Sequence, residues 1–162
     1  MGSGKCPVVL WLHDGSFQTS DGGPKQYGPK LIMDYNVIMV SINYRLGPLG
    51  FLSLESEVVP GNFGLWDQRM ALEWVRREAS NFCGDPSRVS LMGQGAGSES
   101  AIYQLLTPAN QNNSDIYAII AQSGSPVGDP MLKLNHPKEN AIKLAAKLGC
   151  KTDVRIFTDI FS

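Results

Sequence analysis

The chain has 162 residues, of which 43% are hydrophobic, and its 14 lysines and arginines nearly balance its 15 aspartates and glutamates. This length and composition suit one globular domain with an ordinary core. They argue against a nucleic-acid-binding protein, because no basic run is interleaved with aromatic residues. No apolar run approaches the roughly 20 residues needed to cross a bilayer. Residues 1–6 do not resemble a signal peptide, because no apolar segment follows a basic start.

Four short apolar runs predict the strands of the fold. Continuous apolar runs without alternation are typical of strands buried on both faces of a parallel sheet. The runs span residues 8–12, 37–42, 89–92 and 116–121.

Three helical patterns separate or follow these runs, at residues 65–82, 97–106 and 137–149. In the first, Leu65, Leu72, Val75, Ala79 and Phe82 form the expected buried face. The second ends before Pro108, and the third begins at Pro137 and ends at Gly149. Strands alternating with helices predict an α/β fold with a mainly parallel sheet. The long stretches at residues 18–30 and 47–62 are expected to be loops around a functional edge.

The chain has three cysteines, so at least one thiol has no partner within it. Cys6 and Cys83 are expected to be small buried hydrophobic residues. Cys150 directly follows the expected helix end and could pair with a residue beyond Ser162. The triplet that begins at Asn112 is a glycosylation sequon, which favours secretion.

Residues 93–97 carry the most informative motif, Gly-Gln-Gly-Ala-Gly, between a predicted strand and a predicted helix. This is the setting of the nucleophile elbow of α/β-hydrolases, Gly-x-Ser-x-Gly. Gly93 and Gly97 would let the strand and the helix pack closely. The central residue of an enzyme must carry a hydroxyl to attack a carbonyl carbon, and Gly95 has none. A Gly-x-Gly-x-Gly pattern alone would also suggest a phosphate loop, but the flanking sequence argues against that.

Several long motifs around the turn resemble the type-B carboxylesterases and cholinesterases, whose relatives include the non-catalytic, neuroligin-like adhesion proteins. Residues 7–17 read Pro-Val-Val-Leu-Trp-Leu-His-Asp-Gly-Ser-Phe, and residues 41–52 read Ser-Ile-Asn-Tyr-Arg-Leu-Gly-Pro-Leu-Gly-Phe-Leu. Residues 61–68 and 81–89 match the family in the same order. The resemblance implies an α/β-hydrolase fold. It also implies that residues 1–162 are the central portion of a larger carboxylesterase domain, with the oxyanion loop and the nucleophile elbow.

The chain departs from the family where catalysis takes place. Gly95 replaces the nucleophilic serine, as in the neuroligin-like relatives, and Gln94 replaces the preceding glutamate. Asp14 and Ser16 stand where the family has glycines in His-Gly-Gly-Gly. By resemblance, the backbone N–H groups of Gly15, Ser16 and Ala96 would point at the substrate oxygen. If Asp14 faces inward, its charge would lie where negative charge develops in the reaction.

The rest of a catalytic triad is not identified in this chain. By resemblance the acid and the histidine lie beyond Ser162. His13 is expected to be structural and His136 to lie on the surface. The nearest hydroxyls that could replace the nucleophile belong to Ser98, Ser100 and Ser123, and Ser98 has no identified base.

Several other polar and aromatic residues could serve either the structure or the function of the domain. Asn43, Arg45 and Asp67 are expected to form a buried polar network that holds loops, rather than a charge relay. The tryptophans Trp11, Trp66 and Trp74 could line an aromatic gorge. Trp74 is expected in the core, and Trp66 could face either way.

These observations favour a non-catalytic carboxylesterase-like domain that binds other proteins in cell adhesion, outside the cell or on its surface. The alternative is a carboxylic ester hydrolase in which Gly95 is a local anomaly. A third hypothesis is a cleft that binds a small hydrophobic ester or other ligand without turnover. None of these requires a cofactor or a metal, and fold alone does not choose among them.

Overall fold

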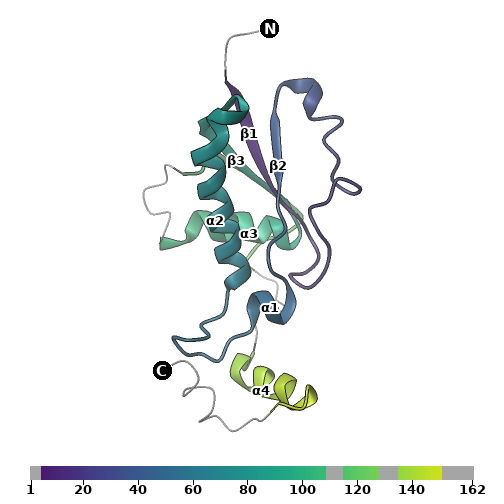
Figure 1. The fold of residues 1–162 in the computed structure, drawn as a ribbon, viewed down its shortest axis with the longest axis vertical. Helices are drawn as coiled ribbons and strands as arrows, with labels where there is room; N and C mark the ends of the chain where they lie inside the picture. The colour runs from purple at the N-terminus through teal and green to yellow at the C-terminus, as the bar shows by residue number, and fades with distance from the viewer. Residues whose placement is uncertain (1–4, 109–114, 128–134, 151–162) are drawn as a thin grey trace.

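The computed structural model describes residues 5–108, 115–127 and 135–150. Within these ranges, four parallel strands form one sheet in the order β2-β1-β3-β4 (Figure 1). Each strand overlaps one apolar run of the sequence, so the predicted parallel α/β architecture is confirmed. The strands are β1 (Cys6–Leu12), β2 (Ile38–Ser41), β3 (Gly84–Gln94) and β4 (Ala118–Gln122).

The register of the two central strands brings two loops together. Leu10 of β1 lies opposite Leu91 of β3, and Leu12 lies opposite Gly93. Because the strands are parallel, the loop that leaves β1 and the turn that leaves β3 meet at the carboxyl edge of the sheet. Ligands of open α/β sheets bind at this edge.

The long predicted helices are present. The structure adds a short helix, α1, within the segment 47–62 expected to be a loop, and a 3-10 turn, η1, between the expected loop at 18–30 and strand β2. Figure 1 shows α4 beside α1, at the end of the molecule away from the N-terminus. The helical elements are η1 (Met33–Tyr35), α1 (Gly47–Phe51), α2 (Phe63–Glu78), η2 (Ala79–Phe82), α3 (Ala96–Leu106) and α4 (Pro137–Lys147).

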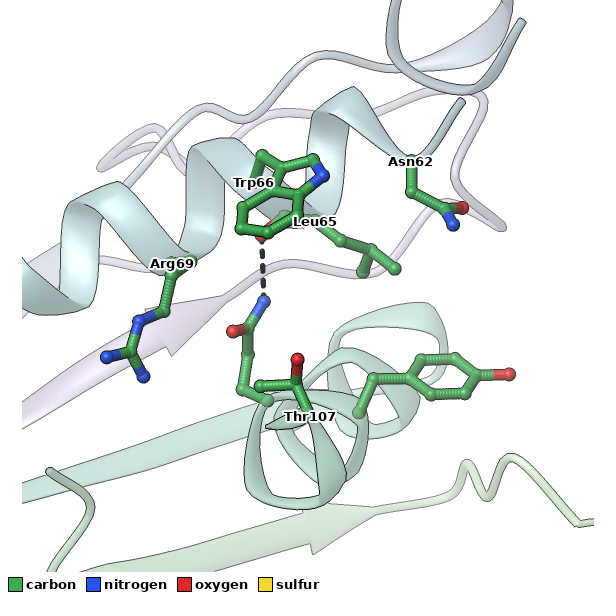
Figure 2. Close-up of a pocket in the computed structure, with 7 residues that line it drawn as sticks. Asn62, Leu65, Trp66, Arg69 and Thr107 are labelled. Carbon is green, nitrogen blue, oxygen red and sulfur yellow. Dashed lines mark hydrogen bonds between the residues drawn. The ribbon is translucent and has the colours of Figure 1, made fainter. Parts of the chain in front are cut away.

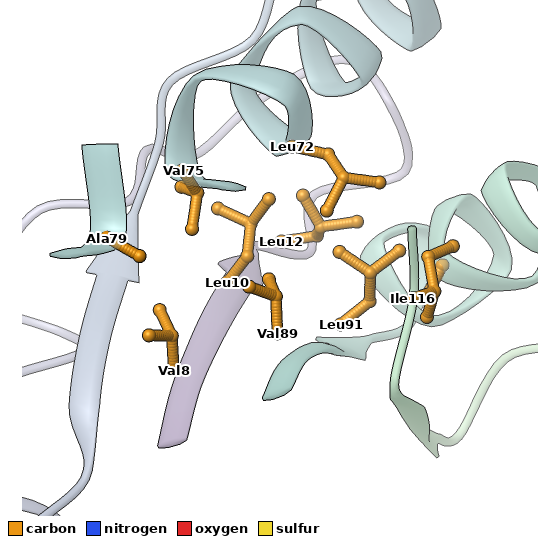
Figure 3. Packing of buried hydrophobic residues seen from close by; sticks show 10 residues of the cluster. Val8, Leu10, Leu12, Leu72, Val75, Ala79, Val89, Leu91 and Ile116 are labelled. Atoms are coloured by element: carbon orange, nitrogen blue, oxygen red, sulfur yellow. The ribbon is translucent and has the colours of Figure 1, made fainter. Parts of the chain in front are cut away.

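The core lies between one face of the sheet and helices α2 and α3 (Figure 3). Val8, Leu10 and Leu12 alternate along β1 and therefore share that face. Leu72 and Val75 meet them from α2, Ala79 from η2, and Ala101 from α3. Val89, Leu91 and Ile116 complete the cluster of buried residues.

Two aromatic residues predicted to be in the core are largely exposed instead. The exposed fraction is 44% for Trp74 and 61% for Phe82. Trp74 lies about 100° around the helix from Val75 and about 200° from Leu72, so it points away from the sheet. Phe82 lies in the 3-10 turn that follows α2, where the α-helical spacing no longer applies. The two rings contact each other, with centroids 6.3 Å apart.

The expected burial of Cys6 and Cys83 is also wrong. All three thiols are free; Cys6 is half-buried, and Cys83 and Cys150 are exposed. Cys83 ends the 3-10 turn in a left-handed conformation, with φ +61°. Its carbonyl accepts a hydrogen bond from Cys6 N over 2.9 Å, so its backbone rather than its thiol is used.

Among the helices described here, none is long and apolar enough to cross a membrane.

Candidate functional site

The turn between β3 and α3 has the geometry of a nucleophile elbow. Gly95 has φ +51° and ψ −120°, a conformation that side chains rarely adopt. Its N–H donates to Gln122 O over 2.9 Å, and its carbonyl accepts from Glu99 N at 3.1 Å. The turn is therefore held by the neighbouring strand and by the first turn of the helix.

The flanking glycines allow the strand and the helix to touch. A Cβ placed on Gly93 would lie 2.3 Å from the carbonyl carbon of Gly97. A Cβ on Gly97 would lie 2.0 Å from Leu12 O. Both positions therefore require glycine, as the motif predicts.

The loop after β1 turns back sharply beside the elbow. Gly15 has φ +124° and Ser16 has φ +53°. The carbonyl of Gly15 accepts hydrogen bonds from Gln18 N at 2.9 Å and Thr19 N at 3.0 Å. A Cβ on Gly15 would lie 2.0 Å from Thr19 O, so this turn excludes any larger residue.

Asp14 faces inward, across the site. Its Oδ1 accepts a hydrogen bond from Ala96 N, the first N–H of α3, over 3.0 Å. A Cβ built on Gly95 would lie 2.1 Å from Asp14 Oδ1, 2.3 Å from Cγ and 2.5 Å from Oδ2. The carboxylate thus fills the volume in which a side chain of residue 95 would begin.

The backbone around Asp14 favours its charged form. Burial alone raises the pKa of the Asp14 carboxyl, but the N–H groups of Ala96, Gly15 and Ser16 together lower that pKa below its ordinary value. Of the three N–H groups that the family resemblance assigns to the substrate oxygen, that of Ala96 donates a hydrogen bond to the Asp14 carboxylate, and those of Gly15 and Ser16 help to lower its pKa.

His13 is buried and held by its neighbours. Its Nδ1 lies 2.6 Å from Asp14 O, and its ring stacks on that of Tyr44 with centroids 4.4 Å apart. The Tyr44 hydroxyl donates to His13 O over 2.8 Å. Burial first, and then the charge of Asp14, raise the pKa of this hydroxyl far above its ordinary value. The sequence alone does not identify Tyr44 as a partner of His13, because only the fold brings the two residues together.

His136 lies far along the chain at the start of α4. Its side chain is 73% exposed, and its Nδ1 is 3.8 Å from Glu139 Oε1. It is a surface residue with a weak partner on its own helix.

The three alternative hydroxyls lie in different surroundings. Ser98 is fully buried, and its Oγ donates to Gly124 O over 2.7 Å. Ser100 is also buried and accepts a hydrogen bond from Gln68 Nε2 at 3.0 Å. Ser123 is exposed, with φ +54°. In the described part of the chain these hydroxyls contact Gly124 and Gln68 rather than a histidine, so neither contact activates a nucleophile.

The tryptophans do not gather around the elbow. Trp11 is buried beside Tyr27, with ring centroids 5.0 Å apart. Trp66 is 58% exposed and borders a separate hollow of about 130 Å³ between α2 and α3. Figure 2 shows Trp66 and Arg69 on the α2 side of this hollow and Thr107 on the α3 side. The dashed bond runs from Gln104 Nε2 to Leu65 O over 2.8 Å.

Asn43, Arg45 and Asp67 hold loops, although the pair between Arg45 and Asp67 is not buried as expected. Asn43 Oδ1 accepts from Gly22 N over 2.8 Å. The Arg45 guanidinium contacts both Asp67 oxygens at 2.7 Å, while its side chain remains 51% exposed. This pair ties the segment before α1 to the first turns of α2.

A larger cavity opens beside the oxyanion loop. Its volume is about 740 Å³, within the usual range for small-molecule pockets. It lies between the loop after β1, helix α1 and helix α4. Its walls include Phe17, Phe51, Leu65, Tyr103, Ala141 and Leu144.

Two further sequence expectations concern sites away from the elbow. The candidate glycosylation residue, Asn112, lies outside the described residues. Within the described ranges, no three His, Cys, Asp or Glu residues are grouped so that they could hold a metal ion.

Comparison with known proteins gives consistent matches. The model of the carboxylesterase family matches residues 1–160. Venom carboxylesterase-6 of Apis mellifera is 40% identical over 151 residues, which cover 91% of this chain and 26% of that protein. Neuroligin-2 of Mus musculus is 39% identical over 149 residues, covering 91% of this chain and 17% of that protein.

A solved structure is similar in fold as well as in sequence. It is juvenile hormone esterase from Manduca sexta with OTFP covalently attached, with a TM-score of 0.82 and 32% identity. The match covers 91% of this chain and 28% of that structure. The chain spans about a quarter of the length of the esterases and lipases that it matches.

Proposed function

Because this chain belongs to the carboxylesterase family and has the α/β-hydrolase fold, we propose that it is a non-catalytic member that acts by binding other proteins. The observation that carries the proposal is Gly95. It occupies the elbow with φ +51° and ψ −120°, but it brings no hydroxyl to the site. Without a nucleophile there is no acyl-enzyme, and only residual catalysis from binding groups would remain.

The surroundings of the elbow support the same proposal. Ser98 and Ser100 use their hydroxyls in buried contacts with Gly124 and Gln68. His13 is buried against Tyr44. None of these groups forms the nucleophile–base pair that ester hydrolysis by this fold requires.

Protein binding in cell adhesion is the role proposed in place of catalysis. The likeness to Neuroligin-2 of Mus musculus supports it. The sequon at Asn112 supports a place of action outside the cell or on its surface.

The alternative is a carboxylic ester hydrolase, and the comparisons give it specific support. Venom carboxylesterase-6 is slightly more similar to this chain than Neuroligin-2 is, at 40% against 39% identity. Overall similarity therefore slightly favours an esterase, and the case for a non-catalytic protein rests on the residues of the elbow.

An esterase assay decides between them. The complete protein that contains this chain is incubated with a short-chain aryl ester, beside the Gly95→Ser variant and a buffer blank. The unmodified protein is expected to hydrolyse the ester no faster than the blank. Hydrolysis by the unmodified protein that a phosphonate inhibitor abolishes would overturn the proposal.

A second assay tests the binding role. Cells that display the complete protein are mixed with untransfected cells, and the formation of cell clusters is scored. Cells that display an unrelated ectodomain, mixed in the same way, serve as the control. The proposed role predicts clusters that contain the displaying cells and that a soluble form of the protein disperses. Equal clustering with the unrelated ectodomain would count against adhesion.

A further inference from the structure

The second departure from the family, Asp14, does more than replace a glycine. Its Oδ1 accepts the Ala96 N–H over 3.0 Å, and the N–H groups of Gly15 and Ser16 help to lower the pKa of the same carboxyl group. By the family resemblance, these three N–H groups would bind the oxygen of an ester in an active relative. We propose that Asp14 is a built-in ligand of the oxyanion hole, and that its carboxylate keeps external carboxylates and ester carbonyls out of the site.

The geometry supports this proposal, because the Asp14 carboxylate already accepts a hydrogen bond from one of the N–H groups of the proposed oxyanion hole. The first N–H groups of an α-helix have no acceptor within the helix, and a negative charge is favoured at that end. Ala96 opens α3, a helix of 11 residues. The charged group in front of it comes from a different part of the chain, 82 residues earlier.

The Asp14 carboxylate also excludes a side chain at position 95 sterically. A Cβ on Gly95 would lie 2.1 Å from Asp14 Oδ1, well inside van der Waals contact. Glycine at position 95 and an inward aspartate at position 14 are therefore compatible with each other. An inward Asp14 and a serine at position 95 are not. The inference goes beyond the loss of the nucleophile, since it means that a hydroxyl restored at position 95 can be accommodated only if Asp14 turns away from the oxyanion hole.

The test measures binding of acetate, a small carboxylate that fits such a hole, to the complete protein. Thermal unfolding is followed during titration with sodium acetate, with sodium chloride at equal ionic strength as the reference. Three forms are compared: unmodified, Asp14→Gly and Asp14→Asn. The asparagine keeps the shape of the side chain and an oxygen acceptor, so it is the matched control for filling without charge.

Asp14→Gly is expected to bind acetate saturably in about the millimolar range, while the unmodified protein and Asp14→Asn show no more shift than with chloride. Equal binding by the unmodified protein would overturn the inference. So would a folded Asp14→Gly variant that does not bind acetate.

If Asp14→Gly does not fold, amide exchange in the unmodified protein decides the question. With ¹⁵N-alanine labelling, the Ala96 amide is expected to exchange at least about tenfold more slowly than an unprotected amide, because Asp14 is its acceptor. Exchange at the unprotected rate would refute the contact. Neither result depends on esterase activity, so a failure of this inference is distinct from a failure of the proposed function.

Discussion

Gln68 of α2 and Ser100 of α3 face each other inside the molecule, and Gln68 Nε2 donates a hydrogen bond to Ser100 Oγ over 3.0 Å. Gln68 is 1% exposed and Ser100 0%. Gln104, also on α3, donates to Gln68 Oε1 at 3.4 Å. These contacts join the two helices that cover the core, of which α3 begins at the candidate site.

Removing one member of this pair is expected to destabilise the protein. Ser100→Ala leaves a buried amide donor without its acceptor, which costs about 1–3 kcal/mol of the free energy of unfolding. Replacing both members by apolar residues, Gln68→Leu with Ser100→Ala, should recover much of this loss. Urea titration measures both effects, with the exposed Ser123→Ala as the control. A Ser100→Ala variant as stable as that control would contradict the role of the pair.

A side chain at position 95 is expected to destabilise the elbow for two separable reasons. The positive φ alone costs about 1–3 kcal/mol, and the contact with Asp14 adds to it. Gly47→Ala serves as the control for the cost of the positive φ alone, because Gly47 has φ +53° but no atom lies within 4 Å of a Cβ placed there. Gly95→Ala should therefore cost more than Gly47→Ala.

The second reason is tested by a double-mutant cycle. Adding Asp14→Gly should make Gly95→Ala less costly than it is in the unmodified background, because the clashing carboxylate is gone. Thermal unfolding of the four forms gives the coupling. Strict additivity would mean that Asp14 moves aside at no cost.

The stabilising effect of Asp14 should depend on pH in a defined direction. The folded-state pKa of its carboxyl is lowered, so its stabilisation is complete above the unfolded pKa of about 3.9 and is lost as pH falls through the folded value. The unmodified protein should therefore unfold at a higher temperature than Asp14→Asn at pH 6. The difference should shrink below about pH 4. A difference that stays constant from pH 6 to strong acid would contradict this linkage.

The apolar face of α2 gives a prediction for the core. Leu72 is fully buried, so Leu72→Ala should lower the free energy of unfolding by about 2–5 kcal/mol through lost contacts and a cavity. Met70 lies on the same helix but is 68% exposed. Met70→Ala should therefore change the free energy of unfolding by no more than about 0.5 kcal/mol. Urea titration of the two variants distinguishes the faces. Similar losses for both would mean that Met70 is covered by another part of the protein.

Much of the fold could be predicted from the order of local patterns. The apolar runs of β1 to β4 mark strands because each is too short and too continuous for an amphipathic helix. Gly93 and Gly97 predict the tight turn because their spacing between a strand and a helix is that of the elbow motif, and the structure confirms that neither position has room for a Cβ. The predicted burial of Trp74 and Cys83 is wrong, because hydrophobic character alone does not tell which side of an element faces the sheet.

The sequence by itself determined that the elbow has no hydroxyl, since Gly95 lacks a side chain in any fold. It also placed an acidic residue in the oxyanion loop, but it left the direction of that side chain open. Only the tertiary structure decided that Asp14 points at Ala96, because the parallel pairing of β1 with β3 brings together loops that are 82 residues apart. The free N–H at the start of α3 attracts a negative charge, and that pairing puts Asp14 within its reach.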